Sequence, residues 1–143
     1  MTKFRSCFRV CGIVVFLTAF SFQLLSQVVY NNGLDIYAKE GAIFFVDGTV
    51  QNEAGLIEVE ENVGNNAQLI IQQDLLNNAT AGGNGYYRVL GNWINNSVFN
   101  AGTGTVFLEG ANQLLDGSVS TYFNNLTLDG SGLKTQTIDQ YCT

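Results

Sequence analysis

The sequence predicts an all-β protein, built as a β-solenoid of short parallel strands (parallel β-helix-like) behind an N-terminal export segment. Short runs of β-branched, aromatic and aliphatic residues alternate with clusters of Asn, Gly and Asp, which is the pattern of strands bounded by turns. A triplet of the form apolar-x-Asn recurs, and after residue 26 no window of about ten residues keeps an apolar helical period. Because proline is absent, nothing in the chain prevents continuous backbone pairing.

The first 26 residues have the pattern of a secretory signal peptide. Lys3, Arg5 and Arg9 precede an apolar run at 10–22, which is shorter than the roughly 20 residues that span a bilayer. Cleavage after Ser26 would leave Gln27 at the start of the mature chain. We therefore expect residues 1–26 to be a signal peptide, with no stable membrane span after cleavage; the alternative is an uncleaved anchor.

The composition of residues 27–143 excludes several function classes. Three of the six basic residues lie in the first 26 and all twelve acidic residues lie after them, so the expected mature chain carries 3 − 12 = −9 charges. This balance argues against nucleic acid and against an anionic membrane as partners. Cys142 has no second cysteine for a disulfide, and the absence of His excludes Ser-His-Asp catalysis. The length suits one domain.

Seven stretches read as strands: 34–38, 42–46, 56–60, 68–72, 86–90, 105–109 and 122–128. In 56–60 the alternation sends Ile57 and Val59 to one face and Glu58 to the other, and we expect the first face to be buried. The predicted core consists of apolar residues at such positions: Ile43, Phe45, Ile57, Val59, Leu69, Ile71, Val89, Val106, Leu108, Leu126 and Leu128.

The triplets at 50–52, 75–77 and 93–95 align as an internal repeat. Each precedes a bend of small residues and then another strand, at 56–60, 86–90 and 105–109 respectively. The three asparagines Asn52, Asn77 and Asn95 are 25 and 18 residues apart, which suits turns of a solenoid that bury their apolar face by stacking. An antiparallel β-sandwich or roll is the alternative, because it also gives short strands at turn-delimited spacing.

Asparagine has a structural role in this interpretation. When identical turns stack, Asn side chains can form hydrogen-bonded ladders, and Asn also tolerates left-handed backbone. Asn-Asn pairs occur at 31–32, 65–66, 77–78, 95–96 and 124–125. The alternative is that each pair marks an exposed loop, but the recurrence of Asn after an apolar residue favours the ladder.

The acidic residues Asp47, Glu58, Glu60 and Glu61 are the candidates for a calcium site, and Glu58 with Glu60 is the candidate for a glycosidase pair. No D-x-[DN]-x-[DN]-G loop accompanies them, and a solvated acidic face explains them better. The sequence therefore predicts a protein that is not an enzyme, with no catalytic, metal or cofactor residues.

Aromatic side chains are the candidates for binding sugars. Tyr86, Tyr87 and Trp93 could form a flat stacking platform, although strand alternation sends about every second residue inward. Trp93 occupies the apolar position of the repeat, where packing is the better explanation.

Residues 91–110, followed by 122–128, resemble repeats in large secreted or cell-surface proteins of the Bacteroidetes, in which "GxWxNNGxFxAGTGTVxFxG…TxFxNLTI" blocks recur. The resemblance implies export, delivery to the surface by the type IX system, and a role in adhesion or surface architecture. It supplies no catalytic residues. Such proteins are far longer than this chain, so we expect either the N-terminal part of a longer protein, truncated within its repeats, or an end that pairs with another chain.

The resulting hypothesis is a secreted or cell-surface structural or adhesion module, whose partners are surface glycans or other surface proteins. The alternative is a carbohydrate-binding module, or the N-terminal fragment of a polysaccharide-active surface protein.

Overall fold

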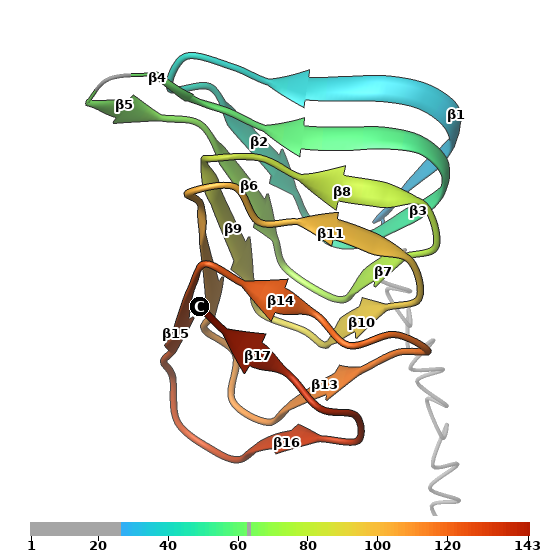
Figure 1. Ribbon diagram of the computed structural model, residues 1–143, viewed down its shortest axis with the longest axis vertical. Helices are drawn as coiled ribbons and strands as arrows, with labels where there is room; N and C mark the ends of the chain where they lie inside the picture. The colour runs from blue at the N-terminus through green and yellow to red at the C-terminus, as the bar shows by residue number, and fades with distance from the viewer. Residues whose placement is uncertain (1–26, 63) are drawn as a thin grey trace, which may run out of the picture.

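The computed structural model describes residues 27–62 and 64–143, so the predicted signal peptide at 1–26 lies outside the described residues. Every regular element in this part of the chain is a strand, and the strands stack in about five turns of a β-solenoid (Figure 1). All paired strands run parallel except in the small hairpin of β4 (Glu61–Asn62) and β5 (Asn65–Asn66). The predicted solenoid is confirmed. The sandwich or roll is wrong, because its sheets would be antiparallel.

The largest sheet covers two sides of the solenoid. Its strands are β1 (Gln27–Ala38), β3 (Gly48–Val59), β7 (Leu75–Asn77), β8 (Thr80–Gly82), β10 (Trp93–Asn95), β11 (Val98–Asn100), β13 (Gln113–Asp116) and β16 (Lys134–Gln136). β1 and β3 bend around a corner of the solenoid. In the later turns separate short strands follow the same path: β7 pairs with the first part of β3, and β8 pairs with its last part.

The third side is a five-stranded parallel sheet. Its strands are β2 (Ile43–Val46), β6 (Gln68–Ile71), β9 (Tyr86–Val89), β12 (Thr105–Leu108) and β15 (Asn125–Leu128). A separate two-stranded sheet joins β14 (Tyr122–Phe123) to β17 (Tyr141–Cys142). The stretch predicted as one strand at 122–128 therefore divides at Asn124, since its two halves belong to different sheets.

The triplet alignment is confirmed by the register, because Asn52 lies opposite Asn77 and Asn77 lies opposite Asn95. The second half of the predicted repeat is confirmed for 86–90 and 105–109, since β9 pairs with β12 in that register, but it is wrong for 56–60. Leu56 pairs with Thr80 of β8, and β9 pairs with β6 instead of with the end of β3. The physical reason is that the β4–β5 hairpin lengthens this turn, so that Gln68 follows Asn52 by 16 residues whereas Tyr86 follows Asn77 by 9.

The corner of the solenoid contains the predicted asparagine ladder. Each Asn donates through its Nδ2 to the Oδ1 of the next: Asn31 to Asn52 at 2.8 Å, Asn52 to Asn77 at 2.9 Å, and Asn77 to Asn95 at 2.8 Å. All four side chains are buried. The amide groups of Asn31, Asn52 and Asn77 also donate to backbone carbonyls, for example Asn77 to Val98 O at 2.9 Å. The ladder thus satisfies polar groups that would otherwise be costly to bury.

The core runs along the solenoid axis. Seven of the eleven predicted core residues are buried: Ile57, Val59, Leu69, Ile71, Val89, Val106 and Leu108. Leu126 is partly buried against this core. The alternation predicted for the end of β3 is confirmed by the burial of Ile57 and Val59.

Three core predictions are wrong. Ile43 is 62% exposed and Phe45 is 54% exposed, because the register of β2 places Phe44 and Val46 over buried Leu69 and Ile71 instead. Both β2 faces are apolar, so the sequence alone does not show which one points inward. Leu128 stacks on Leu108 but remains 54% exposed, because no strand pairs with the other edge of β15 within the described residues.

Candidate functional site

The outer surface of the β2–β6–β9–β12–β15 sheet is the candidate functional site. On each of these strands, alternate side chains point away from the core. The register aligns Phe45, Ile70, Arg88 and Phe107 in one outward column, and Ile43, Gln68 and Tyr86 in the column beside it. We define the aromatic face as the apolar and cationic members of these two columns: Ile43, Phe45, Ile70, Tyr86, Arg88 and Phe107.

Tyr86 and Phe107 form the centre of the aromatic face. Their rings meet edge to face, with centroids 5.5 Å apart and an interplanar angle of 83°. The Arg88 guanidinium carbon lies 4.8 Å from the centroid of the Phe107 ring, within the range of a cation–π interaction. Parallel pairing positions this group, since Phe107 of β12 lies directly opposite Arg88 of β9.

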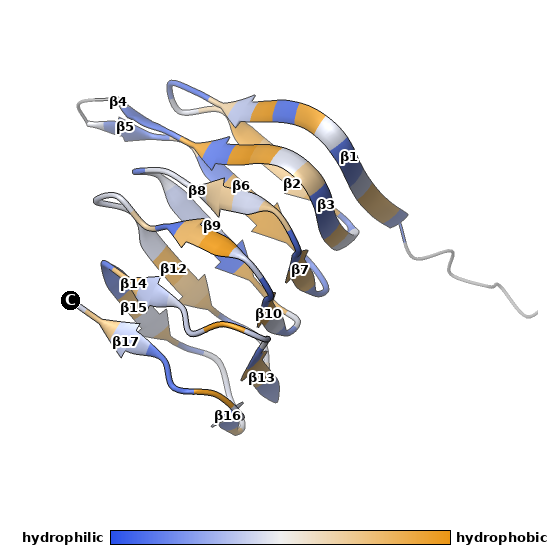
Figure 2. Ribbon diagram, turned by 45° about the vertical axis from the view of Figure 1, so that its right-hand side comes forward, coloured by the Kyte–Doolittle hydropathy of each residue, from blue (hydrophilic) through white to orange (hydrophobic). Residues whose placement is uncertain are grey.

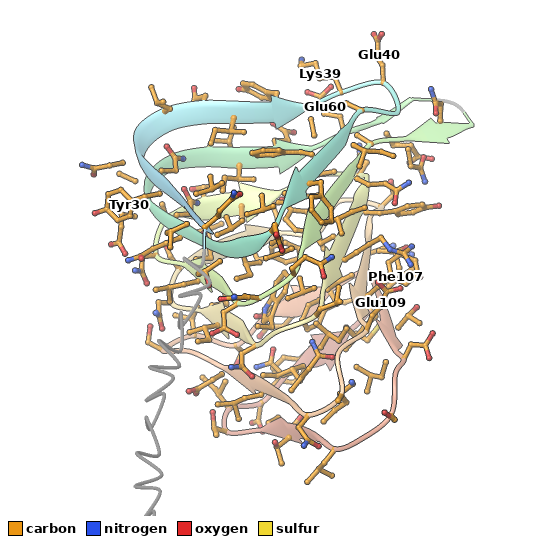
Figure 3. The ribbon with its side chains drawn as sticks, turned by 180° about the vertical axis from the view of Figure 1, so that it is seen from behind. Tyr30, Lys39, Glu40, Glu60, Phe107 and Glu109 are labelled. Atoms are coloured by element: carbon orange, nitrogen blue, oxygen red, sulfur yellow. The ribbon has the colours of Figure 1, made fainter. Side chains whose placement is uncertain are left out.

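Arg88 is held in place by Glu109. Its Nε donates to Glu109 Oε2 at 3.1 Å, and its Nη2 donates to Oε1, so that the contact is bidentate. Both side chains are partly exposed, at 33% and 21% respectively. Figure 3 shows Phe107 and Glu109 beside one another on the outer flank of the solenoid. The arrangement presents an aromatic pair next to a fixed ion pair, a combination that can stack on an apolar ring face and hydrogen-bond polar groups around it.

Two of the three predicted stacking residues lie inside the molecule. Trp93 is completely buried and Tyr87 is 1% exposed, so neither ring can reach a sugar. They form an interior aromatic cluster with Phe99 and Phe123, whose ring centroids lie 4.9 to 6.2 Å apart in the paired contacts. The expectation that Trp93 packs in the core is confirmed, and Tyr86 alone keeps a surface position.

The polar atoms of the two buried rings have partners. Trp93 Nε1 donates to Thr121 Oγ1 at 3.2 Å. The Tyr87 hydroxyl accepts from Gly82 N at 3.0 Å and lies within hydrogen-bond distance of two carbonyl oxygens, Gly82 O at 2.7 Å and Ile57 O at 3.1 Å. Burial raises the pKa of Tyr87 far above its ordinary value, because the charged phenolate would be desolvated.

Three of the acidic candidates have different surroundings. Glu60 pairs with Lys39 at 3.0 Å, while Glu61 accepts a hydrogen bond from Thr103 Oγ1 at 3.2 Å. Glu58 lines a separate groove of about 300 Å³ beside Gly82 and Asn100. Within residues 27–62 and 64–143, no group of three or more His, Cys, Asp or Glu side chains is placed to hold a metal ion.

Most of the aromatic face could not be predicted from the residue pattern. Phe45 and Ile43 carry the same apolar signal as core residues, and only the register of β2 shows that they point outward. No motif in the sequence marks Arg88 as part of a surface site, although its position two residues after Tyr86 places both on one face of a strand.

No helix in the described part of the chain is long and apolar enough to cross a membrane. No protein-family model matches the chain, and comparisons with curated proteins and with solved structures likewise give no match.

Proposed function

We propose that this chain is a secreted or cell-surface structural and adhesion module, with no catalytic site of its own. The observation that carries the proposal is the difference between the interior of the solenoid and its aromatic face. The interior is filled by packed side chains and the asparagine ladder, while the aromatic face presents apolar and aromatic groups on four adjacent strands, β2, β6, β9 and β12. Exposed apolar patches of this kind mark sites of interaction with other molecules.

Two sequence features support a location outside the cell. The pattern at 1–26 is that of a signal peptide, and the likeness of 91–110 and 122–128 to Bacteroidetes surface repeats points the same way. Export by the type IX system is part of this proposal.

Export is tested by expressing the full chain with a C-terminal tag and comparing it with a variant in which Val14, Val15 and Phe16 are changed to Asp. We expect the unaltered chain to leave the cytoplasm and to begin at Gln27 when its N-terminus is sequenced, whereas the variant stays inside at full length. Retention of both forms in the cytoplasm would contradict the proposal.

A second candidate function is carbohydrate binding on the aromatic face. The observation that favours it is the edge-to-face contact of Tyr86 with Phe107 next to the Arg88–Glu109 ion pair. A sugar ring has apolar faces and polar edges, which match an aromatic group flanked by hydrogen-bonding charges.

A glycan array tests this candidate. Retention of the full chain should fall about tenfold or more in Tyr86→Ala, if a sugar ring stacks on the tyrosine as strongly as a nucleic-acid base stacks on an aromatic side chain, roughly 1 to 3 kcal/mol. Tyr122→Ala is the matched control, since Tyr122 is 57% exposed but belongs to the separate β14–β17 sheet. If no glycan binds at millimolar concentration, or if both variants lose binding equally, the aromatic face is not a carbohydrate site.

A further inference from the structure

The first turn of the solenoid has an open strand edge. β1 pairs with β3 and β2 pairs with β6, and no described strand lies on the other side of either. Figure 2 shows β1 at the end of the stack, with apolar residues beside polar ones along it. An open edge of this kind has unpaired N–H and C=O groups that can bind another strand.

Hydrogen bonds show which residues direct their backbone groups to the open side. The carbonyls of Ala38 and Val46, whose side chains are buried, accept from Glu60 N at 2.8 Å and Gln72 N at 3.0 Å, toward the next turn. Along a strand, the side chain and the backbone N–H and C=O groups both reverse direction at each residue. Residues whose side chains face the same way therefore also direct their backbone groups to the same side. The outward-facing residues therefore direct their N–H and C=O groups to the open edge: Val28, Tyr30, Asp35, Tyr37, Ile43 and Phe45.

The side chains at this edge are mostly apolar and well exposed. Val28, Tyr30, Leu34, Tyr37, Ile43 and Phe45 are each 45 to 70% exposed. Asp35 is the single charged residue in β1 and β2, in a chain whose formal net charge is −6. Two such edges can therefore approach one another without the repulsion expected elsewhere on this acidic protein.

The opposite end of the solenoid is a poorer match for this edge. There, Lys134 and Gln136 of β16 occupy the positions that continue the inward columns of Gln113 and Leu115. Lys134 Nζ donates to the carbonyls of Gly110 and Ala111. Head-to-tail stacking would bury Gln136 against Val29 in the same column, and an amide buried without a partner is costly.

We propose that the first turn pairs with the first turn of a second copy of this chain, forming a closed dimer. The twofold axis would pass through the β1 corner at 31–34 and through the middle of β2. Antiparallel pairing then places Tyr30 opposite Asp35 of the other copy, Val28 opposite Tyr37, and Ile43 opposite Phe45.

Every residue in these three pairs directs its backbone groups to the open side, so a single register satisfies β1 and β2 together. It also places the Asp35 carboxylate opposite the Tyr30 ring, with no like charge facing it. In such an isologous contact both copies use the same surface, so the assembly closes at a dimer.

The size of the contact suits a stable dimer. A whole solenoid turn takes part, and the turn from Asn31 to Asn52 contains 21 residues. Interfaces of standard size use about 20 to 30 residues on each side.

Sedimentation equilibrium of the purified full chain, combined with hydrogen exchange, tests the dimer. We expect twice the chain mass at micromolar concentration, and slower exchange at 27–38 and 43–46 as concentration rises. Tyr37→Pro removes an N–H at the open edge without breaking a bond inside the solenoid, and should yield a monomer. Tyr122→Ala is the control, because it changes an exposed residue on the separate β14–β17 sheet, and it should remain dimeric.

Three results would overturn the dimer. They are a monomer at every concentration, head-to-tail oligomers that keep growing, and slow hydrogen exchange at 27–38 and 43–46 that does not depend on concentration. The last result would mean that the same chain covers its own edge. If Tyr37→Pro does not fold, Phe45→Lys is the second edge variant. It should also dissociate the dimer, and a dimer that persists in folded Phe45→Lys contradicts the pairing.

Discussion

Asn77 donates a hydrogen bond through its Nδ2 to the Oδ1 of Asn95 at 2.8 Å, and it accepts one through its own Oδ1 from Asn52 at 2.9 Å. One side chain therefore joins three successive turns of the solenoid. The three asparagines occupy the same inward position on stacked strands. This relationship makes the turn the unit of both the sequence repeat and the structure.

Replacing Asn77 by alanine should lower the free energy of unfolding by about 2 to 4 kcal/mol, because it leaves buried polar groups of the two neighbouring turns without partners. Urea denaturation measures the change. Asn96→Ala is the control: its partly exposed amide donates to Asn78 at 2.7 Å on the outside of the same corner. We expect a loss below about 1 kcal/mol for the control. Equal losses in the two variants would show that the inner ladder has no special role.

The ladder ends at Asn95, whose Nδ2 is buried and has no hydrogen-bond partner among the described residues. Ile94 pairs with Asp116, so Gly117 occupies the next ladder position. A side chain does not fit there, since φ is +143° and a Cβ would overlap the Asn95 carbonyl oxygen.

Gly117→Ala should therefore cost about 3 kcal/mol or more of stability, by adding steric overlap to backbone strain. Gly64→Ala is its matched control, because Gly64 has φ of +79° but a Cβ there would meet no atom within 4 Å. The control should lose only about 1 to 2 kcal/mol. Thermal unfolding of the two variants compares them, and a smaller loss at Gly117 than at Gly64 would count against this account of the ladder's end.

Thr121→Val should destabilise the chain by about 1 to 3 kcal/mol, since it leaves the buried indole N–H of Trp93 without its acceptor. Trp93 is the single tryptophan, so its fluorescence reports on this site alone. We expect blue-shifted emission from the folded chain that moves to the red on unfolding. Thr105→Val, on the surface of β12, provides the comparison and should change stability little. An exposed-type emission spectrum in the folded protein would contradict the burial of Trp93.

The raised pKa of Tyr87 predicts a loss of stability at alkaline pH. The folded state binds the phenolic proton more tightly than the unfolded state, whose pKa is near the ordinary value of 10.0. The contribution of this group is therefore fully present below pH 10 and decreases as pH rises above it, by up to about 1.4 kcal/mol per pH unit.

Urea denaturation between pH 9 and 11.5 measures this dependence. Tyr87→Phe keeps the ring but cannot ionise, so its stability should fall less steeply with pH than that of the unaltered chain. Parallel slopes in the two proteins would show that Tyr87 ionises normally.

Much of the fold could be predicted from residue patterns because it rests on local rules. The alternation at Ile57 and Val59 specifies which face is buried, and the spacing of Asn52, Asn77 and Asn95 specifies which residues stack. Asn31 extends the same ladder, and Val29-Tyr30-Asn31 has the same apolar-x-Asn form, although the three aligned triplets do not include it.

The surface was harder to predict, because it depends on register between strands far apart in the chain. In β2, four consecutive apolar residues give no alternation, and only pairing with β6 shows that Phe45 faces outward. Tyr86 and Tyr87 are adjacent and chemically alike, yet one lies on the aromatic face and the other is buried. The sequence alone does not distinguish them, since a shift of one residue exchanges the two faces of a strand.

Hydrogen exchange of the asparagine side-chain amides, followed by NMR, tests the central claim most directly. If the turns stack through a buried ladder, the Nδ2 protons of Asn52 and Asn77 should exchange far more slowly than those of the exposed Asn32, and Asn95→Ala should accelerate exchange at Asn77. Exchange of Asn77 at the rate of an exposed amide would contradict the ladder and the stacked-turn architecture built on it.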